Sequence, residues 1–162
     1  MRRAFLLAGV LAAVCLSAIT IPLSGYMSDR IGRKKMYIIG AATMGVFGFV
    51  YFGLIDTGSS VLIFLAMALS LIPHDMQYGP QAALIAESFT PRLRYSGASI
   101  GYQLASITAG GPAPLIATAL FAAYKSGTPI AIYILVTAVI SITATMFLKD
   151  YTGKDVSAEY DH

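Results

Sequence analysis

The chain has 162 residues, of which 57% are hydrophobic and 12% charged, and its formal net charge is +3. A soluble globular domain carries about 25% charged residues, so a water-soluble core of this length could not bury so much apolar surface. A lipid bilayer accepts such a surface, because helices satisfy their own backbone groups within hydrocarbon, and the composition predicts an all-α membrane protein whose partner is the lipid bilayer.

Five apolar runs are each long enough to cross about 30 Å of hydrocarbon at a rise of about 1.5 Å per residue. The predicted transmembrane helices span residues 4–27, 36–55, 61–86, 97–124 and 128–148. Residues 149–162 form a polar tail that we expect to be cytoplasmic and mobile. The chain is therefore interpreted as one bundle of five helices.

The basic residues predict the orientation, because short loops rich in Lys and Arg stay in the cytoplasm. Eight of the eleven Lys and Arg residues fall on the side of residues 28–35. This places the carboxy terminus inside and the amino terminus outside a cell (inner) membrane. Arg2 and Arg3 alone would favour a cytoplasmic amino terminus, so we expect further sequence upstream.

Residues 28–35 form a short polar joint between the first two spans, and together with the end of the first span residues 25–35 read Gly-Tyr-Met-Ser-Asp-Arg-Ile-Gly-Arg-Lys-Lys. Gly25 allows close helix approach, Asp29 can cap a neighbouring helix N-terminus, and Gly32 permits a tight turn. The alternative is an ordinary basic loop that only orients the chain. The basic residues expected at the lipid headgroups are Arg30, Arg33, Lys34 and Lys35.

This joint resembles the signature loop of the major facilitator superfamily, which carries it after its second helix and, in a related form, after its eighth. Residues 78–103 resemble helices ten to eleven of the metabolite:proton symporters, the group of proline/betaine, shikimate and alpha-ketoglutarate carriers. The resemblance covers nearly the whole chain, including residues 150–155. It implies that the five spans correspond to helices eight to twelve of a twelve-helix carrier and that the amino-terminal half, supplied upstream or by another chain, is missing.

Polar residues in the third span are candidates for a proton and solute pathway. A charged group at the centre of a span costs about 2.5 to 3.5 kcal/mol, so His74 and Asp75 need an explanation. His74, Gln77, Tyr78 and Gln81 recur at helical spacing and predict one polar stripe. An imidazole and a carboxylate can exchange a proton near neutral pH. The alternative is a local structural pair, or a displacement of this span toward the membrane interface that leaves both groups in water.

Prolines and small residues predict where the spans bend and pack. Pro73 and Pro80 predict a bend in the third span. In the fourth span, Tyr102 and Gln103 are further pathway candidates, and residues 110–112, Gly-Gly-Pro, predict an interruption. Small residues at intervals of four predict a ridge for close helix contact: Gly97, Gly101, Ala105 and Ala109. A weaker polar stripe in the first span either lines a cavity or bonds its own backbone: Ser17, Thr20 and Ser24.

Charged residues at the second cytoplasmic joint are candidates for a gate. Glu87, Arg92 and Arg94 resemble a charge pattern of the same family. Ion pairs between these residues and residues 29–35 could close the cytoplasmic side in one state and open it in another. The alternative is a solvated charge cluster.

The sequence contains no phosphate-binding loop, nucleophile triad or metal-ligand motif, and Cys15 is its single cysteine. We therefore predict no enzyme, no cofactor, no metal and no nucleic-acid partner. The leading hypothesis is proton-coupled symport of a small organic acid or zwitterionic metabolite by a longer chain of which this is part. The alternative is a non-transporting truncated membrane protein or partner subunit with a structural role.

Overall fold

The computed structural model describes residues 3–154 of the chain, and this part is helical without strands. Its elements are α1 (Arg3–Ile31), α2 (Arg33–Asp56), α3 (Ser60–Leu69), α4 (Leu71–Ala86), α5 (Arg94–Ala105), the π-helical turn η1 (Ser106–Gly110), α6 (Pro112–Tyr124) and α7 (Thr128–Met146). Because α3 runs into α4, and α5 runs through η1 into α6, the elements form five apolar helices long enough to cross a membrane. The predicted all-α membrane fold with five long helices is confirmed.

The turn between α1 and α2 is shorter than the sequence suggested. Residues 28–35 were expected to form a polar joint, but α1 continues to Ile31 and α2 begins at Arg33. Gly32 alone reverses the chain, with φ 109° and ψ 127°, a backbone conformation open to glycine because it lacks a Cβ atom. The Gly32 N–H still donates to the Ser28 carbonyl oxygen at 3.0 Å, so helical hydrogen bonding continues into the turn.

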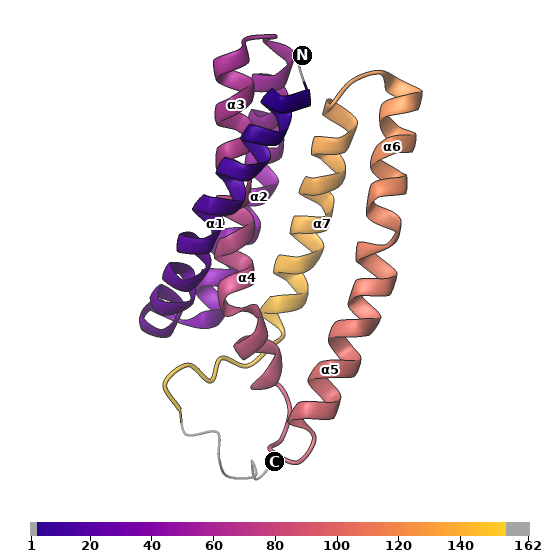
Figure 1. Cartoon of the computed structure of the whole chain (residues 1–162). Helices are drawn as coiled ribbons and strands as arrows, with labels where there is room; N and C mark the ends of the chain where they lie inside the picture. The colour runs from indigo at the N-terminus through magenta and orange to yellow at the C-terminus, as the bar shows by residue number, and fades with distance from the viewer. Residues whose placement is uncertain (1–2, 155–162) are drawn as a thin grey trace.

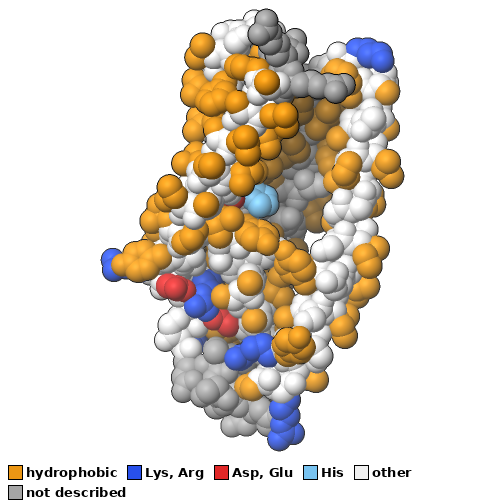
Figure 2. Space-filling view, in the orientation of Figure 1, with side chains coloured by type: hydrophobic (Ala, Val, Ile, Leu, Met, Phe, Trp, Pro, Cys, Tyr) orange, Lys and Arg blue, Asp and Glu red, His pale blue; other side chains and the backbone are white. Residues whose placement is uncertain are grey.

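The helices form a bundle and one outlying rod (Figure 1). The helices α1, α2, α4 and α7 pack along their lengths, with α3 against α1 and α2. The rod of α5, η1 and α6 touches this bundle through α4 near one end and through α7 near the other. Figure 2 shows hydrophobic side chains along the length of the molecule and most charged side chains gathered at its lower end, around the α1–α2 turn and the start of α5.

Small residues set the close packing inside the bundle. Gly40 on α2 is buried, and a Cβ atom there would lie 2.9 Å from the backbone nitrogen of Gln77 on α4. A Cβ atom on Gly79 of α4 would lie 2.8 Å from the backbone nitrogen of Gly25 on α1. Membrane helices associate through such close backbone approaches, because lipid gives them little hydrophobic driving force.

Two of the long helices are interrupted, as the sequence predicts. The α3–α4 rod breaks at Ser70, one turn before Pro73, because a proline cannot donate to the carbonyl four residues earlier and clashes with it. In the other rod, the Gly111 N–H donates to the Ser106 carbonyl oxygen at 3.0 Å, which makes the π-helical turn before Pro112. Pro80 lies within α4 without ending it.

The predicted small-residue ridge of the fourth span does not pack along its length in the described part of the chain. Helix α5 has no buried residue, and a Cβ atom on Gly101 would meet nothing within 4 Å. The reason is the position of the rod, which stands away from the bundle except near its ends. Gly97 does pack closely, since a Cβ atom there would lie 2.5 Å from the Phe89 ring in the connection after α4, but among residues 3–154 the ridge as a whole makes no helix-to-helix contact at Gly101.

Candidate functional site

Asp75 lies on α4 and faces α1, where it has no exposed surface. Its Oδ2 atom accepts a hydrogen bond from the Ser17 hydroxyl at 2.6 Å and another from the Thr20 hydroxyl. Both donors come from α1, one helical turn apart, so the weak polar stripe predicted on the first span faces the carboxylate. A buried carboxylate needs such donors, because an unpaired charge in a low-dielectric interior is very costly.

His74 points to a different side of α4, because consecutive helical residues are separated by about 100°. Its side chain is 50% exposed, and its Nδ1 atom lies 3.2 Å from Asp75 Oδ1. The imidazole ring stacks on Tyr78, with 5.4 Å between ring centroids. His74 therefore connects the buried carboxylate to an accessible face of the helix.

A groove along α2, α4 and α7 contains His74. One part of it, about 230 Å³, is lined mainly by apolar and aromatic side chains, including Phe47 and Tyr51. A second part, about 250 Å³, adds the polar side chains of Gln77 and Ser141. His74, Met44 and Ile134 line both parts, so the two form one groove.

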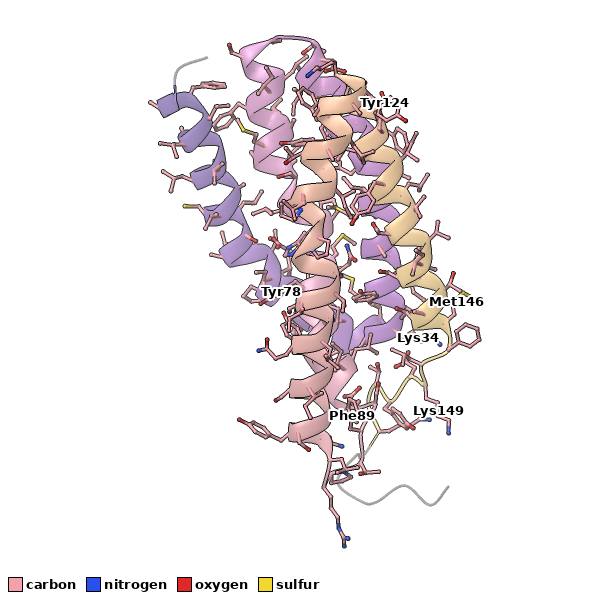
Figure 3. The ribbon with its side chains drawn as sticks, turned by 90° about the vertical axis from the view of Figure 1, so that its right-hand side faces the viewer. Lys34, Tyr78, Phe89, Tyr124, Met146 and Lys149 are labelled. Atoms are coloured by element: carbon pink, nitrogen blue, oxygen red, sulfur yellow. The ribbon has the colours of Figure 1, made fainter. Side chains whose placement is uncertain are left out.

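A second groove runs between α4 and the rod of α5 and η1. Its two parts measure about 270 Å³ and 240 Å³ and share Tyr102 and Ile85 as lining residues. Gln103 lines the first part and Gln81 the second. Tyr78, labelled midway along the molecule in Figure 3, interacts with Tyr102 through its hydroxyl group and stacks on His74. Tyr78 thus lies between the two grooves, and the predicted stripe of His74, Gln77, Tyr78 and Gln81 is divided between them.

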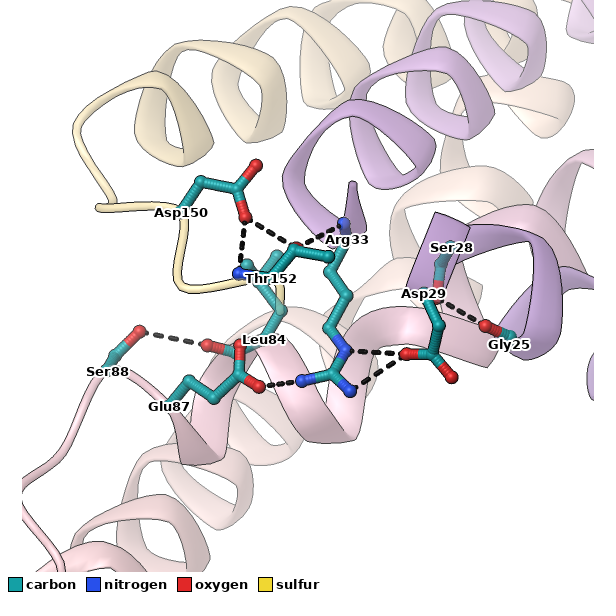
Figure 4. A network of polar contacts seen from close by, with 9 residues as sticks. All are labelled: Gly25, Ser28, Asp29, Arg33, Leu84, Glu87, Ser88, Asp150 and Thr152. Carbon is teal, nitrogen blue, oxygen red and sulfur yellow. Dashed lines mark hydrogen bonds and ion pairs between the residues drawn. The ribbon is translucent and has the colours of Figure 1, made fainter. Parts of the chain in front are cut away.

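At the end of the bundle that carries most of the charge, Arg33 connects three helices (Figure 4). Its Nη2 and Nε atoms donate to Asp29 Oδ1 of α1 at 2.8 and 3.1 Å. Its Nη1 atom forms an ion pair with Glu87 Oε1, just beyond α4. The Glu87 side chain is 10% exposed and that of Asp29 58%, so the network joins one buried and one exposed carboxylate through a single guanidinium.

One expectation for this region changes. Asp29 was expected to cap a helix, but its carboxylate binds the Arg33 side chain and α2 has no side-chain cap at Gly32. The reason is the one-residue turn, which places the Arg33 guanidinium one helical turn from Asp29. Arg30 lies outside the network, with its guanidinium 4.7 Å from the centre of the Tyr26 ring.

Arg92 and Arg94 follow the turn after Glu87. Arg92 lies in the connection between α4 and α5, and Arg94 is the first residue of α5. The Oε2 atom of Glu87 is buried and has no hydrogen-bond partner among the described residues. The structure therefore brings Glu87 and Arg33 together and places Arg92 and Arg94 on the following segment.

The segment after α7 is tied to the α1–α2 turn. The Arg33 backbone N–H donates to the Thr152 hydroxyl oxygen at 2.9 Å, and that hydroxyl donates to Asp150 at 2.6 Å. The Lys34 ammonium donates to the carbonyl oxygens of Met146 and Leu148 at 2.8 and 2.7 Å. The start of α2 and the end of α7 thus satisfy each other's free backbone groups. The expected mobile tail is wrong for residues 150–152, and residues 155–162 lie outside the described part.

Asp150 is the charged group on which this attachment depends. Partial burial alone raises the pKa of its carboxyl, but the side-chain and backbone hydrogen bonds from Thr152 and the charges of Lys34 and Lys35 outweigh that effect. The pKa of Asp150 is therefore lower than its ordinary value of 3.8. Ionised Asp150 is favoured by the folded tail.

Residues 4–161 match the family model of the Major Facilitator Superfamily. The chain belongs to this superfamily. The matched range includes both carboxylates bound by Arg33 and the Asp75 site, and the predicted superfamily is confirmed.

Relatives within the superfamily are metabolite transporters by name. The shikimate transporter of Escherichia coli (strain K12) is 37% identical over 92% of this chain and 34% of its own length. A putative metabolite transport protein of Haemophilus influenzae is 30% identical over 91% of this chain and 34% of its length. The ectoine/proline transporter of Corynebacterium glutamicum is 27% identical over 88% and 28%.

These names agree with the predicted group of metabolite symporters. The chain spans about a third of the length of the curated relatives it matches. No solved structure matches the chain significantly.

Sequence reasoning missed two contacts of this superfamily member. The bond from Ser17 to Asp75 joins residues 58 positions apart, and the bond from Arg33 to Thr152 joins residues 119 apart. The spacing of Ser17 and Thr20 did indicate that both hydroxyls share one helix face. The Asp150-Tyr151-Thr152 triplet, typical of a local side-chain turn, was the available signal for the ordered tail.

Proposed function

We propose that the chain is part of a secondary transporter that moves a small organic acid or a zwitterionic metabolite together with protons. The observation that supports proton coupling is Asp75, which has no exposed surface near the middle of the 27-residue span Ser60–Ala86. A charged carboxylate is costly at this depth, so its presence there calls for a functional explanation. The His74 imidazole contacts Asp75 and lines a groove, and histidine is the side chain best suited to proton exchange in this setting.

The grooves beside α4 fit the proposed type of solute. Their lining residues carry hydroxyl and amide groups and no Lys, Arg, Asp or Glu. Such groups hydrogen-bond both carboxylates and ammonium groups. Relatives are named for shikimate and for ectoine and proline, which supports a small polar metabolite. The remainder of the solute site is proposed to come from further parts of the carrier, in the same or another chain.

The Arg33 network is proposed as the cytoplasmic gate. Arg33 holds the end of α1 and the end of α4 together through Asp29 and Glu87. Breaking these ion pairs would free the two ends to separate, which is the kind of two-state change that alternating access requires. In this proposal the α1–α2 turn lies in the cytoplasm, the amino terminus of the chain lies outside, and the membrane is the cell (inner) membrane.

The test is solute uptake into vesicles that contain the full-length protein under an imposed proton gradient. We expect Asp75→Asn and His74→Ala to lower gradient-driven uptake by about tenfold or more, because each removes a proton-exchanging group. Asp56→Asn is the control, since Asp56 is exposed at the far end of α2. Control-level uptake in both variants would contradict the role assigned to His74 and Asp75.

A structural role without transport or enzymatic activity is the competing interpretation. It predicts that the wild-type protein gives no gradient-driven uptake of any organic acid or zwitterion, although it inserts into the same vesicles. Uptake that follows the proton gradient in the wild type would exclude this interpretation.

A further inference from the structure

The contact between Asp75 and α1 suggests how proton occupancy could change helix packing. Asp75 Oδ2 is held by two neutral hydroxyls of another helix, those of Ser17 and Thr20. His74 is the one titratable group within hydrogen-bonding reach of Asp75 among residues 3–154. No Lys, Arg, Asp or Glu occurs in α1 between Ala4 and Ser28, in α3, or in α2 between Met36 and Ile55, and the titratable side chains there are Cys15, Tyr26, Tyr37 and Tyr51.

The Thr20 hydroxyl has a choice of two acceptors. It donates to Asp75 Oδ2 and also lies 3.2 Å from the Leu16 carbonyl oxygen of its own helix. A hydroxyl has one proton to donate. While Asp75 is ionised, its charge draws that proton across the helix interface, because hydrogen bonds to ionised groups are the stronger ones. Once Oδ2 is protonated, the carboxyl itself becomes a donor and the Thr20 proton is free to return to Leu16.

Next to this contact, the backbones of α1 and α4 are too close together to admit another atom between them. A Cβ atom on Gly79 would lie 2.8 Å from the Gly25 nitrogen and 2.9 Å from the Ile21 carbonyl oxygen. Ile21 directly follows Thr20 in the sequence. A change at the hydroxyl–carboxylate contact therefore acts beside a backbone crossing. Beyond that crossing, α1 carries Asp29 and α4 leads to Glu87, the two carboxylates held by Arg33.

We infer that Ser17 and Thr20 are positioning residues whose hydroxyls couple the protonation state of Asp75 to the packing of α1 on α4. This inference rests on the proposed proton coupling. It adds the two hydroxyl groups through which protonation of Asp75 on α4 would alter the contact with α1. Ser17 and Thr20 do not exchange the proton themselves. They stabilise the ionised carboxylate, and Thr20 changes its acceptor when the carboxylate is neutralised.

The test is infrared titration of the 162-residue chain in detergent or lipid nanodiscs. The protonated-carboxyl band of Asp75 is identified by its loss in Asp75→Asn and followed against pH. Thr20→Val and Ser17→Ala each remove one donor to the ionised form, so we expect the protonation midpoint to rise by about one pH unit. Thr20→Ser keeps the hydroxyl and is expected to keep the wild-type midpoint.

A matched control separates this role from ordinary packing. Thr43→Val removes a threonine hydroxyl that donates to the Ile39 carbonyl oxygen at 2.8 Å on α2, and it should leave the Asp75 midpoint unchanged. Midpoints in Thr20→Val and Ser17→Ala that equal those of Thr43→Val would overturn the inference. Either of the two variants that folds is sufficient, with the helical circular dichroism signal as the criterion.

The outcome is independent of the transport assay. Shifted midpoints without gradient-driven uptake would support the hydroxyl contact and contradict the proposed function. Proton-driven uptake with unshifted midpoints would leave the function in place and contradict the contact's role.

Discussion

At the scale of single residues, the ion pair between Glu87 and Arg33 is the charged contact with the largest expected effect on stability. The Glu87 side chain is 10% exposed, it pairs with Arg33, and its second carboxylate oxygen has no hydrogen-bond partner in the described part of the chain. A buried charge that loses its partner cannot recover its hydration, and the loss costs about 3–5 kcal/mol. Asp29 is 58% exposed, and an exposed ion pair contributes about 0–1 kcal/mol.

We therefore predict that Arg33→Gln lowers stability far more than Asp29→Asn. The arginine variant removes the guanidinium that pairs with the buried Glu87 carboxylate, whereas the aspartate variant leaves the Arg33–Glu87 pair intact. Thermal unfolding of both variants in detergent measures the difference. The double variant Arg33→Gln with Glu87→Gln should regain part of the loss, and equal losses in Arg33→Gln and Asp29→Asn would contradict the prediction.

Gly79 gives a second prediction at this scale. A Cβ atom at this position would lie within 3 Å of backbone atoms of both Gly25 and Ile21, and backbone cannot move aside as a flexible side chain can. Gly79→Ala should cost about 1–3 kcal/mol, as overpacking does, and lower the thermal unfolding midpoint. Gly53→Ala is the matched control, since a Cβ atom there meets nothing within 4 Å, and it should be neutral or stabilising.

Residue types were easier to predict than residue partners. The cost of charge in lipid singled out His74 and Asp75, and helical spacing placed His74, but not Asp75, on the predicted polar stripe. The structure separates them, since Asp75 faces Ser17 across a helix interface while His74 lines a groove. Periodicity reports which residues share a helix face and carries no information about which other helix that face meets.

At the scale of elements, Pro73 accounts for the break between α3 and α4. Pro73→Ala restores an N–H that can bond the carbonyl four residues earlier and removes the ring clash. We predict a straighter rod, measured as a longer spin-label distance between Val61→Cys and Ala82→Cys, both exposed positions, in a Cys15→Ser background. An unchanged distance would assign the break to packing against α1 and α2.

The attachment of the tail to α2 should depend on pH. Because the pKa of Asp150 is lowered in the folded chain, its contribution to stability is complete above the ordinary value of 3.8 and is lost as pH falls through the folded value. Wild type should therefore unfold at a higher temperature than Asp150→Asn at neutral pH, and the gap should close in acid. A gap that stays constant with pH would show that the carboxylate charge is irrelevant.

Hydropathy predicted the helices correctly within the lipid-exposed segments. It did not predict the helix ends at the α1–α2 turn, where the local backbone conformation determines the boundary. All five long helices were predicted from their apolar runs, but residues 28–31 and 33–35 belong to helices although they are polar. One glycine with a positive φ was enough to turn the chain. Hydropathy cannot predict such a turn, because polar residues can remain helical in the headgroup region.

At the scale of the whole molecule, the exposed apolar side chains indicate that the protein is surrounded by lipid. Large hydrophobic residues are exposed along every long helix, for example Leu11 at 64% and Val139 at 54%. Such a surface is satisfied by lipid and not by water. We predict that the purified chain is monodisperse in detergent and aggregates when detergent is removed, measured by size-exclusion chromatography with light scattering.

The proposed orientation is tested by thiol labelling in a Cys15→Ser background. Lys35→Cys, at the start of α2, should react with a membrane-impermeant maleimide only after the cells are permeabilised. Ser59→Cys, at the opposite end of α2, should react in intact cells, since both positions are exposed. The reverse pattern would contradict both the orientation and the cytoplasmic gate.

The mutual capping of α2 and α7 has a consequence for biogenesis. The Arg33 N–H and the Lys34 ammonium find their partners between Met146 and Thr152, more than a hundred residues later. While these residues are being synthesised, the α1–α2 hairpin is therefore made before the partners of its turn exist. The contacts of the α1–α2 turn are therefore completed only after α7 and residues 147–152 have been synthesised.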